Sequence, residues 1–277
     1  MIFAILVAYS EDYFIKSLQE LKKVLKLTAR KHKIIVVFNN QRLADKLHVF
    51  EANVGVDFDV VIGSNQYHEF SGWSEGLDFV KINYTNDYKQ SGYIFCNDTF
   101  CHHRTYTHFH RLINAIGANL AFISRKPALA GEIHSVDKDF EFNRIKFNSW
   151  VSSYFFAINQ YAMKSMDFKV LPDGEVIGEY LIGGCDEAHF LSNTMDSTLK
   201  NHILNNLFHG GWYKSEALNE TNKDMFYYKA RSILAELNLS SKAHANKLNF
   251  IDTYYLNKLM GKLMSNKLRD KIRSMLN

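Results

Sequence analysis

The sequence predicts an α/β fold, with helices on both faces of a parallel sheet and a mostly helical C-terminal part. Three observations lead to this prediction. Short runs of β-branched and aliphatic residues recur through the first half of the chain, segments with apolar residues at helical spacing separate them, and few polar residues interrupt the runs. Such strands are buried on both faces, as in parallel sheets that helices cover. From Glu187 onward the pattern is mostly helical.

The elements of the first half follow from this pattern in order. Ile2 to Val7 is a continuous strand-like run, and Ser10 is placed to cap a helix whose apolar residues are Phe14, Leu18, Leu21 and Leu25. Further buried strands are predicted at 34–38, 58–62 and 93–96, and helices at 74–82 and 106–116. A short strand is predicted at 120–123.

The second half contains one strongly strand-like segment at 150–158 and helical segments at 190–208 and 222–239. No repeat, low-complexity tract or proline-rich linker interrupts the chain, which has only 2 prolines. We therefore expect one domain over residues 1–250, followed by a C-terminal tail over residues 251–277.

Composition and the length of the apolar runs exclude several classes of protein. With 47% hydrophobic and 22% charged residues, the chain is typical of globular proteins rather than of disordered or fibrous ones. The first apolar run, Ile2 to Ala8, is far shorter than the ~18 residues that cross a bilayer, and it lacks the basic flank of a signal peptide. Three cysteines without metal-site spacing fit a reducing compartment, so we expect a cytoplasmic protein.

The net charge of +4 is concentrated in the tail. Residues 256–277 contain six basic residues and one acidic residue, so the rest of the chain is close to neutral and no nucleic-acid partner is expected. Apolar residues of this segment recur at steps of three and four: Leu256, Leu259, Met260, Leu263, Met264, Leu268, Ile272 and Met275. A basic amphipathic helix of this kind suits an anionic membrane surface. Packing on the protein's own body, or on a second subunit in a homo-oligomer, is the alternative.

Polar residues follow the predicted strands at the point where each strand ends. They are Tyr9 and Ser10, Asn39 and Asn40, Ser64 and Asn65, and Asn97 and Asp98. Ligands of open α/β sheets bind outside the carboxyl ends of the strands, so these side chains are the first candidates for a binding site.

Asp98 stands out among them, because it directly follows a buried strand and is flanked by Asn97 and Thr99. Oxygen ligands of this type suit a divalent cation, Mg²⁺ or Mn²⁺, which one carboxylate can hold together with substrate phosphates and water. Alternatively, the three residues form a turn that ends the strand and caps the next helix.

Several segments together resemble bacterial glycosyltransferases that synthesise cell-surface polysaccharides such as O-antigen and capsule, including relatives of the rhamnan-synthesis type. The resemblance rests on Glu69–Trp73 with Gly76, on Asn97–Thr99, on Trp150–Ser153 with Phe155–Asn159, and on Gly211–Tyr213 with Lys229, Ile233, Glu236, Leu239 and Ser240. It spans most of residues 1–250.

This resemblance implies a GT-A fold, with a donor half over about residues 1–125 and an acceptor half over about 126–250. Asp98 then corresponds to the acidic residue of the metal and diphosphate motif. Asn97 departs from the usual two-carboxylate form of that motif. The resemblance also favours a donor contact for Gly72, whereas Trp73 either stacks on the donor or is a buried tryptophan at the start of a helix.

Sugar transfer with inversion needs a base for the acceptor hydroxyl. Asp186 and Glu187, after Gly183 and Gly184, are the candidates, and Glu179 and Glu132 compete with them. Acidic residues are also common in the first turn of a helix, because they interact favourably with its dipole. His209 is a candidate metal ligand. The group His102, His103, His108 and His110 has no matching ligand nearby and is interpreted as part of a solvated helix.

These expectations describe a cytoplasmic glycosyltransferase, with a possible peripheral site on the inner membrane. It would transfer a sugar from a nucleotide-sugar donor to a hydroxyl of a cell-surface glycan or a lipid-linked acceptor. A sugar nucleotidyltransferase is the first alternative, but residues 8–13 lack its glycine-rich and basic loop. A non-catalytic partner subunit with the same fold is the second.

Overall fold

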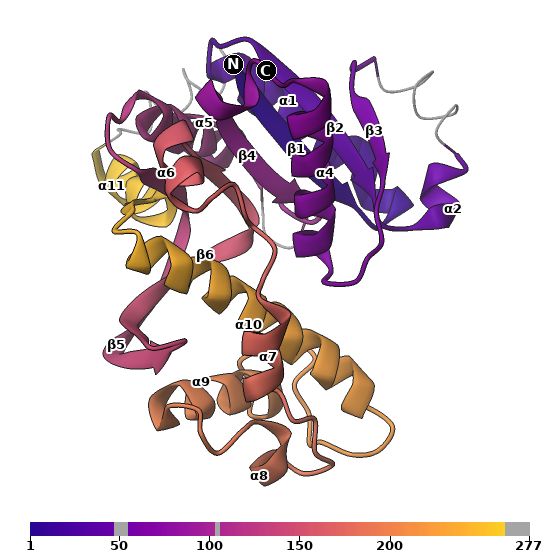
Figure 1. Cartoon of the computed structure of the whole chain (residues 1–277), viewed down its shortest axis with the longest axis vertical. Coiled ribbons are helices and arrows are strands. Elements are labelled where there is room, and N and C mark those ends of the chain that lie inside the picture. Colours follow the sequence, from indigo (N-terminus) through magenta and orange to yellow (C-terminus); the bar gives the residue numbers. More distant parts are fainter. Residues whose placement is uncertain (47–54, 103–105, 264–277) are drawn as a thin grey trace. The chain divides into compact units, whose positions relative to one another are not determined.

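A computed structural model describes residues 1–46, 55–102 and 106–263 (Figure 1). The chain divides into two compact units. Unit 1 comprises the described residues of Met1–Ile133, Ser152–Lys169 and Leu248–Asn277, and unit 2 comprises His134–Val151 and Val170–Lys247. The chain therefore leaves unit 1 twice and returns to it twice.

One mixed sheet has the strand order β3-β2-β1-β4-β6-β5-β7 (Figure 1). Its strands are β1 (Ile2–Ala8), β2 (His32–Phe38), β3 (Asp59–Ile62), β4 (Gly92–Asn97), β5 (Ala128–Phe142), β6 (Ile145–Ile158) and β7 (Asn249–Asp252). The first four strands are parallel to one another, as the sequence predicts.

The parallel sheet that is predicted from the first half of the chain does not continue into the second half. β6 runs antiparallel to β4, and β5 is parallel to β7. The physical reason lies in the two-residue connection between β5 and β6, where Asn143 and Arg144 both have positive φ angles of 51° and 60°. Such a turn joins two strands as a hairpin, whereas parallel neighbours need a long crossover.

Helices cover both faces of the parallel part of the sheet. Alternate residues of β1, including Ile2, Ala4 and Leu6, share a core with α1 (Glu11–Leu27) and α5 (His108–Ile123). The opposite face of β1 packs against α4 (Glu69–Asn83), whose glycines lie against Val7 and Ile5. Shorter helices of unit 1 are α2 (Gln41–Ala44), the 3₁₀ helix η1 (Tyr88–Gln90), α6 (Gln160–Ser165) and α11 (Thr253–Leu263).

Two predicted elements differ from those observed. Residues 120–123 form the last turn of α5 rather than a strand, because the buried residues Ala115, Ala118 and Ala121 continue its helical spacing. The helix predicted over 190–208 is divided into α8 (Glu187–Phe190) and α9 (Ser197–Phe208). Asp196 starts α9 by accepting hydrogen bonds from the backbone N–H groups of Thr198 and Leu199.

Unit 2 is largely helical apart from its segments of β5 and β6. It contains α7 (Gly174–Tyr180), α8, α9 and α10 (Lys223–Ala245). Phe208 makes edge contacts with Phe190 and Phe226 at 5.3 and 4.8 Å between ring centroids, which ties α8, α9 and α10 together. Within the described part of the chain, no helix is both long and apolar enough to cross a membrane.

Candidate functional site

The carboxyl ends of β1, β2 and β4 meet where the strand order reverses. β1 lies between β2, which follows it in sequence, and β4, which lies on its other side (Figure 1). Open α/β sheets bind ligands in the crevice at such a reversal. The residues directly after these strands were predicted as ligand contacts from the sequence, and three of them do lie together. Asn39 Nδ2 donates to the Tyr9 hydroxyl at 3.2 Å, and Asn40 Nδ2 donates to the Tyr9 carbonyl at 3.1 Å.

Asp98 is fully buried at this point and organises the backbone around it. Its Oδ2 accepts hydrogen bonds from the backbone N–H groups of Tyr9 at 2.6 Å and Ser10 at 2.7 Å. Its backbone carbonyl accepts a hydrogen bond from Ser17 Oγ at 2.6 Å. These contacts join the end of β4 to the turn between β1 and α1, so that Asp98 fixes the position of Tyr9.

Asn97 forms the turn that the sequence offered as an alternative to a metal site. Its Oδ1 accepts hydrogen bonds from the backbone N–H and the hydroxyl of Thr99, at 3.1 and 2.7 Å. An asparagine oxygen engaged in this way closes an Asx turn after a strand. The side chains of Asn97 and Asp98 therefore both have structural partners within the protein.

These contacts do not fit the expected Mg²⁺ or Mn²⁺ site. The Asp98 carboxylate, which the sequence predicts to hold the cation together with substrate phosphates and water, is fully buried, and its Oδ2 already accepts two N–H groups. Among residues 1–46, 55–102 and 106–263, no group of three His, Cys, Asp or Glu side chains is placed to hold a metal ion. His209, the other predicted ligand, belongs to unit 2, where its Nε2 lies 2.9 Å from Glu187 Oε2.

Carboxylate and amide side chains lie near Tyr9, and one of them, Glu69, had no role assigned to it from the sequence. Glu69, at the start of α4, is buried and accepts a hydrogen bond of 2.6 Å from Ser153 Oγ on β6. Burial raises the pKa of Tyr9, and the nearby carboxylates of Glu69 and Asp98 raise it further, so its hydroxyl stays protonated. Within the described residues, Asn39 Oδ1 is buried without a hydrogen-bond partner. The motif beginning at Glu69 was the only sequence signal for this carboxylate.

Gly72 and Trp73 serve packing rather than an open binding surface. A Cβ at Gly72 would lie 2.7 Å from Val7 Cγ2, so the glycine lets α4 approach β1 closely. Trp73 is fully buried, and its Nε1 donates to the Cys96 carbonyl at 3.0 Å. Its ring makes edge contacts with Phe70, Phe95 and Phe156. Of the two interpretations of Trp73, the buried tryptophan agrees with this geometry.

Asp186 and Glu187, the predicted catalytic carboxylates, lie at the start of α8. Asp186 caps this helix by accepting a hydrogen bond from the backbone N–H of His189 at 3.0 Å. The side-chain hydrogen bond from His189 lowers the pKa of Asp186, which weakens it as a base. Asp186 therefore has a structural role at the start of α8, in line with the alternative that acidic residues interact favourably with a helix dipole. Glu187 pairs with His209 instead.

Two of the histidines near residue 105 have structural partners, whereas His108 Nδ1 is buried without a hydrogen-bond partner among the described residues. His102 stacks on Tyr13 at 4.3 Å between ring centroids and contacts its carbonyl through Nε2. His110 forms a capping box with Thr107 at the start of α5. His103 lies outside the described residues.

A hollow of about 260 Å³ in unit 2 brings together two segments on which the resemblance rests. Trp150 of β6 lies between His134 and His202, with ring centroids 5.8 and 5.1 Å away, and Lys229 and Glu236 of α10 complete the lining. Burial lowers the pKa of His202, and the nearby His134 adds to the effect.

Comparison with protein-family models and with curated proteins finds no match to this sequence.

Proposed function

We propose that the protein is a glycosyltransferase of the GT-A type, which moves a sugar from a nucleotide-sugar donor to a hydroxyl of a cell-surface glycan or lipid-linked acceptor. One observation carries the proposal. The strand order reverses between β1 and β4, and uncharged polar side chains of Tyr9, Asn39 and Asn40 meet at that edge. Ligand binding at such an edge is the general behaviour of open α/β sheets.

In this proposal the nucleotide lies against the turn after β1. Asn39 Oδ1 has no partner among the described residues and can accept a hydrogen bond, and Asn40 Nδ2 has a second hydrogen beside the one it donates to the Tyr9 carbonyl, so the two amides are suited to contacts with a base or ribose. Asp98 is a positioning residue, since its contacts to the backbone of Tyr9 and Ser10 fix this turn. No step of the proposed reaction depends on a bound cation.

The transfer forms a bond between the acceptor oxygen and the anomeric carbon, and it breaks the bond from that carbon to the diphosphate. The hydroxyl proton must pass to a base if the configuration inverts. Of the two carboxylates predicted for this role, Glu187 is the better candidate, because the hydrogen bond from His189 lowers the pKa of Asp186.

A sugar nucleotidyltransferase agrees less well with the turn after β1. That turn consists of Tyr9 and Ser10 alone, and both of its N–H groups donate to Asp98. They are therefore not available to cradle a triphosphate. A cytoplasmic location, with peripheral attachment to the inner membrane through the tail, belongs to the proposal as well.

A thermal-shift experiment tests the proposal directly. The full chain is heated with uridine, guanosine, cytidine, adenosine and deoxythymidine diphosphates, each with and without Mg²⁺. We expect one diphosphate to raise the melting temperature, because a ligand at 100 times its Kd adds about 2.7 kcal/mol to stability. The Asn40→Ala variant should lose most of that shift. Stabilisation by none of the diphosphates would refute donor binding, and binding without sugar transfer would favour the non-catalytic alternative.

A further inference from the structure

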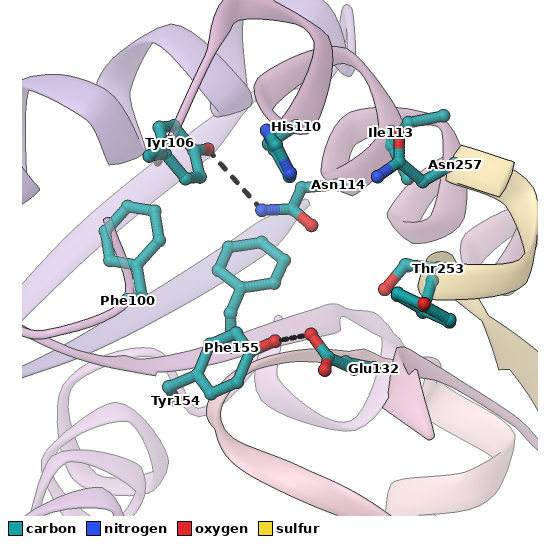
Figure 2. A pocket seen from close by; sticks show the side chains of 11 residues that line it. Phe100, Tyr106, His110, Ile113, Asn114, Glu132, Tyr154, Phe155, Thr253 and Asn257 are labelled. Carbon is teal, nitrogen blue, oxygen red and sulfur yellow. Dashed lines mark hydrogen bonds between the residues drawn. The ribbon is translucent and has the colours of Figure 1, made fainter. Parts of the chain in front are cut away.

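Unit 1 contains a pocket of about 220 Å³, in addition to the hollow described in unit 2 (Figure 2). Its walls come from the segment after β4, from α5, from β5 and β6, and from the first turns of α11. Its lining is Phe100, Tyr106, His110, Ile113, Asn114, Glu132, Tyr154, Phe155, Thr253, Tyr254 and Asn257. The volume is below the about 300–1,000 Å³ of sites for drug-sized ligands, so the pocket suits a single ring.

Aromatic rings form one side of this pocket. Phe100 lies 5.6 Å from both Tyr106 and Phe155, measured between ring centroids, and the three rings support one another. Burial raises the pKa of Tyr106, so its hydroxyl stays neutral and can donate. Rigid aromatic side chains of this kind offer flat apolar surface to the C–H face of a ligand.

Polar groups line the other side (Figure 2). Tyr154 donates a hydrogen bond to Glu132 across β6 and β5, which fixes the carboxylate at the pocket wall. Asn114 reaches the Tyr106 hydroxyl only through a long contact of 3.4 Å. Within the described part of the chain, the side chains of Thr253 and Asn257 make no hydrogen bond to the protein, so their polar atoms are available to a ligand.

The lining selects a class of ligand. A hydrocarbon would cover the polar atoms of Thr253 and Asn257 without giving them hydrogen-bond partners, which is costly for polar groups removed from water. Among the described residues, the lining contains no lysine or arginine to bind a phosphate, and Glu132 would repel one. A ring with several hydroxyl groups satisfies amides and carboxylate together, because each hydroxyl both donates and accepts.

We propose that this pocket binds one neutral, hydroxylated six-membered ring, a pyranose sugar. The interpretation of that sugar as the end of the acceptor rests on the proposed function. It agrees with the position of Phe100, whose backbone N–H donates to the Asn97 carbonyl at 3.3 Å and which follows Asp98 by two residues. The segment after β4 therefore contributes to the candidate donor site through Asp98 and to this pocket through Phe100. Glu132, a competitor for the acceptor-side role in the sequence, would hold a hydroxyl of this ring.

The test is ligand-observed NMR on the full chain with methyl glycosides of glucose, galactose, mannose and N-acetylglucosamine as probes. Two adjacent tyrosines of α11 give a matched pair of variants, since Tyr254 lines the pocket, Tyr255 does not, and both are exposed (56% and 61%). We expect at least one glycoside to bind, with roughly fivefold weaker binding in Tyr254→Ala and in Asn257→Ala and unchanged binding in Tyr255→Ala.

Three outcomes would overturn the proposal. They are no glycoside binding at all, binding that is equal in Tyr254→Ala and Tyr255→Ala, and binding of choline or inorganic phosphate in place of the glycosides. The diphosphate thermal shift separates this proposal from the proposed function. Glycoside binding without any nucleotide shift would support the pocket and refute the glycosyltransferase, and a nucleotide shift without glycoside binding would do the reverse.

Discussion

The carboxylate of Asp98 accepts a hydrogen bond of 2.6 Å from the backbone N–H of Tyr9, a residue 89 positions earlier in the chain. The bond joins the end of β4 to the turn after β1, and a second bond from Ser10 strengthens it. This contact places Tyr9 at the sheet edge where a ligand is expected, while the carboxylate of Asp98 stays buried inside the protein. Asp98 therefore acts on the candidate site through Tyr9.

The Asp98→Ala variant should be clearly less stable than the wild-type protein. The side chain is fully buried, and the substitution leaves two backbone N–H groups without their charged acceptor. We expect a loss of about 3 kcal/mol in the free energy of unfolding, measured in urea. Asp78→Ala, at an exposed carboxylate that pairs with Lys81, should cost less than about 1 kcal/mol. Equal effects of the two variants would contradict the role of Asp98.

A buried ion pair between α1 and α5 should make stability depend on pH. Arg111 donates to Glu20 through Nε at 2.9 Å and through Nη2 at 2.7 Å, and both side chains are buried. Burial alone would raise the pKa of Glu20, but hydrogen bonds from Lys23 and Arg111 lower it below 4.5. Because the folded-state pKa of Glu20 is lowered, the pair stabilises the fold at pH values above the ordinary pKa of 4.5. This contribution is lost as the pH falls through the folded-state pKa.

The variant that tests this pair is Glu20→Gln. It leaves Arg111 charged and buried, so we expect a loss of about 3 kcal/mol at pH 7. Urea denaturation from pH 7 to pH 3 should show the gap from the wild type closing as the pH falls. The double variant Glu20→Leu with Arg111→Met should be more stable than Glu20→Leu alone, since it removes both charges. A gap that stays constant with pH would show that Glu20 contributes by packing.

The Gly72→Ala variant tests whether Gly72 is needed for the close packing of α4 on β1 or for contact with the donor. The added Cβ would meet Val7 Cγ2 at 2.7 Å, so we expect a cost of about 1–3 kcal/mol in stability. Gly178→Ala is the matched control, because Gly178 lies in α7 with no atom within 4 Å of the added Cβ. That variant should be more stable by about 0.5–1 kcal/mol. If Gly72→Ala keeps full stability and loses only nucleotide binding, the donor contact expected from the sequence is the better account.

The sequence predicted the parallel half of the sheet well, because buried parallel strands leave a local signal. The runs at β1, β2 and β4 are apolar on both faces, and their ends carry the polar residues that meet at the site. Direction in the second half depended on the turn at Asn143 and Arg144, a pair with no strong turn signature. The role of Asp98 depended on Tyr9 and Ser10, and contacts across 89 residues leave no local pattern.

The same limit applies to the predicted catalytic and metal-binding residues. In a sequence, an acidic residue that caps a helix looks the same as one that acts as a catalytic base. At Asp186, only the hydrogen bond from the backbone N–H of His189 distinguished the two roles. The pocket around Glu132 joins β5, β6, α5 and α11, so no single segment of sequence contains its signal. Its tyrosines and asparagines are ordinary surface residues until the fold brings them together.

The tail gives the last prediction. The stripe that begins at Leu256 starts within α11, and residues 264–277, which hold four of the six basic residues, lie outside the described residues. We expect the full chain to pellet with vesicles of anionic lipid at low salt and not with neutral vesicles, because each basic residue near such a surface contributes about 1 kcal/mol. Replacing Lys267, Arg269, Lys271 and Arg273 by Gln should reduce pelleting by roughly tenfold or more.

The control removes the same charge from exposed residues of unit 1, namely Lys16, Lys26, Arg30 and Lys31. If both sets of substitutions reduce pelleting equally, net charge rather than the tail drives binding. If neither does, while Leu268→Asp with Ile272→Asp dissociates a dimer in sedimentation velocity, the tail packs against a second subunit and the membrane interpretation is wrong.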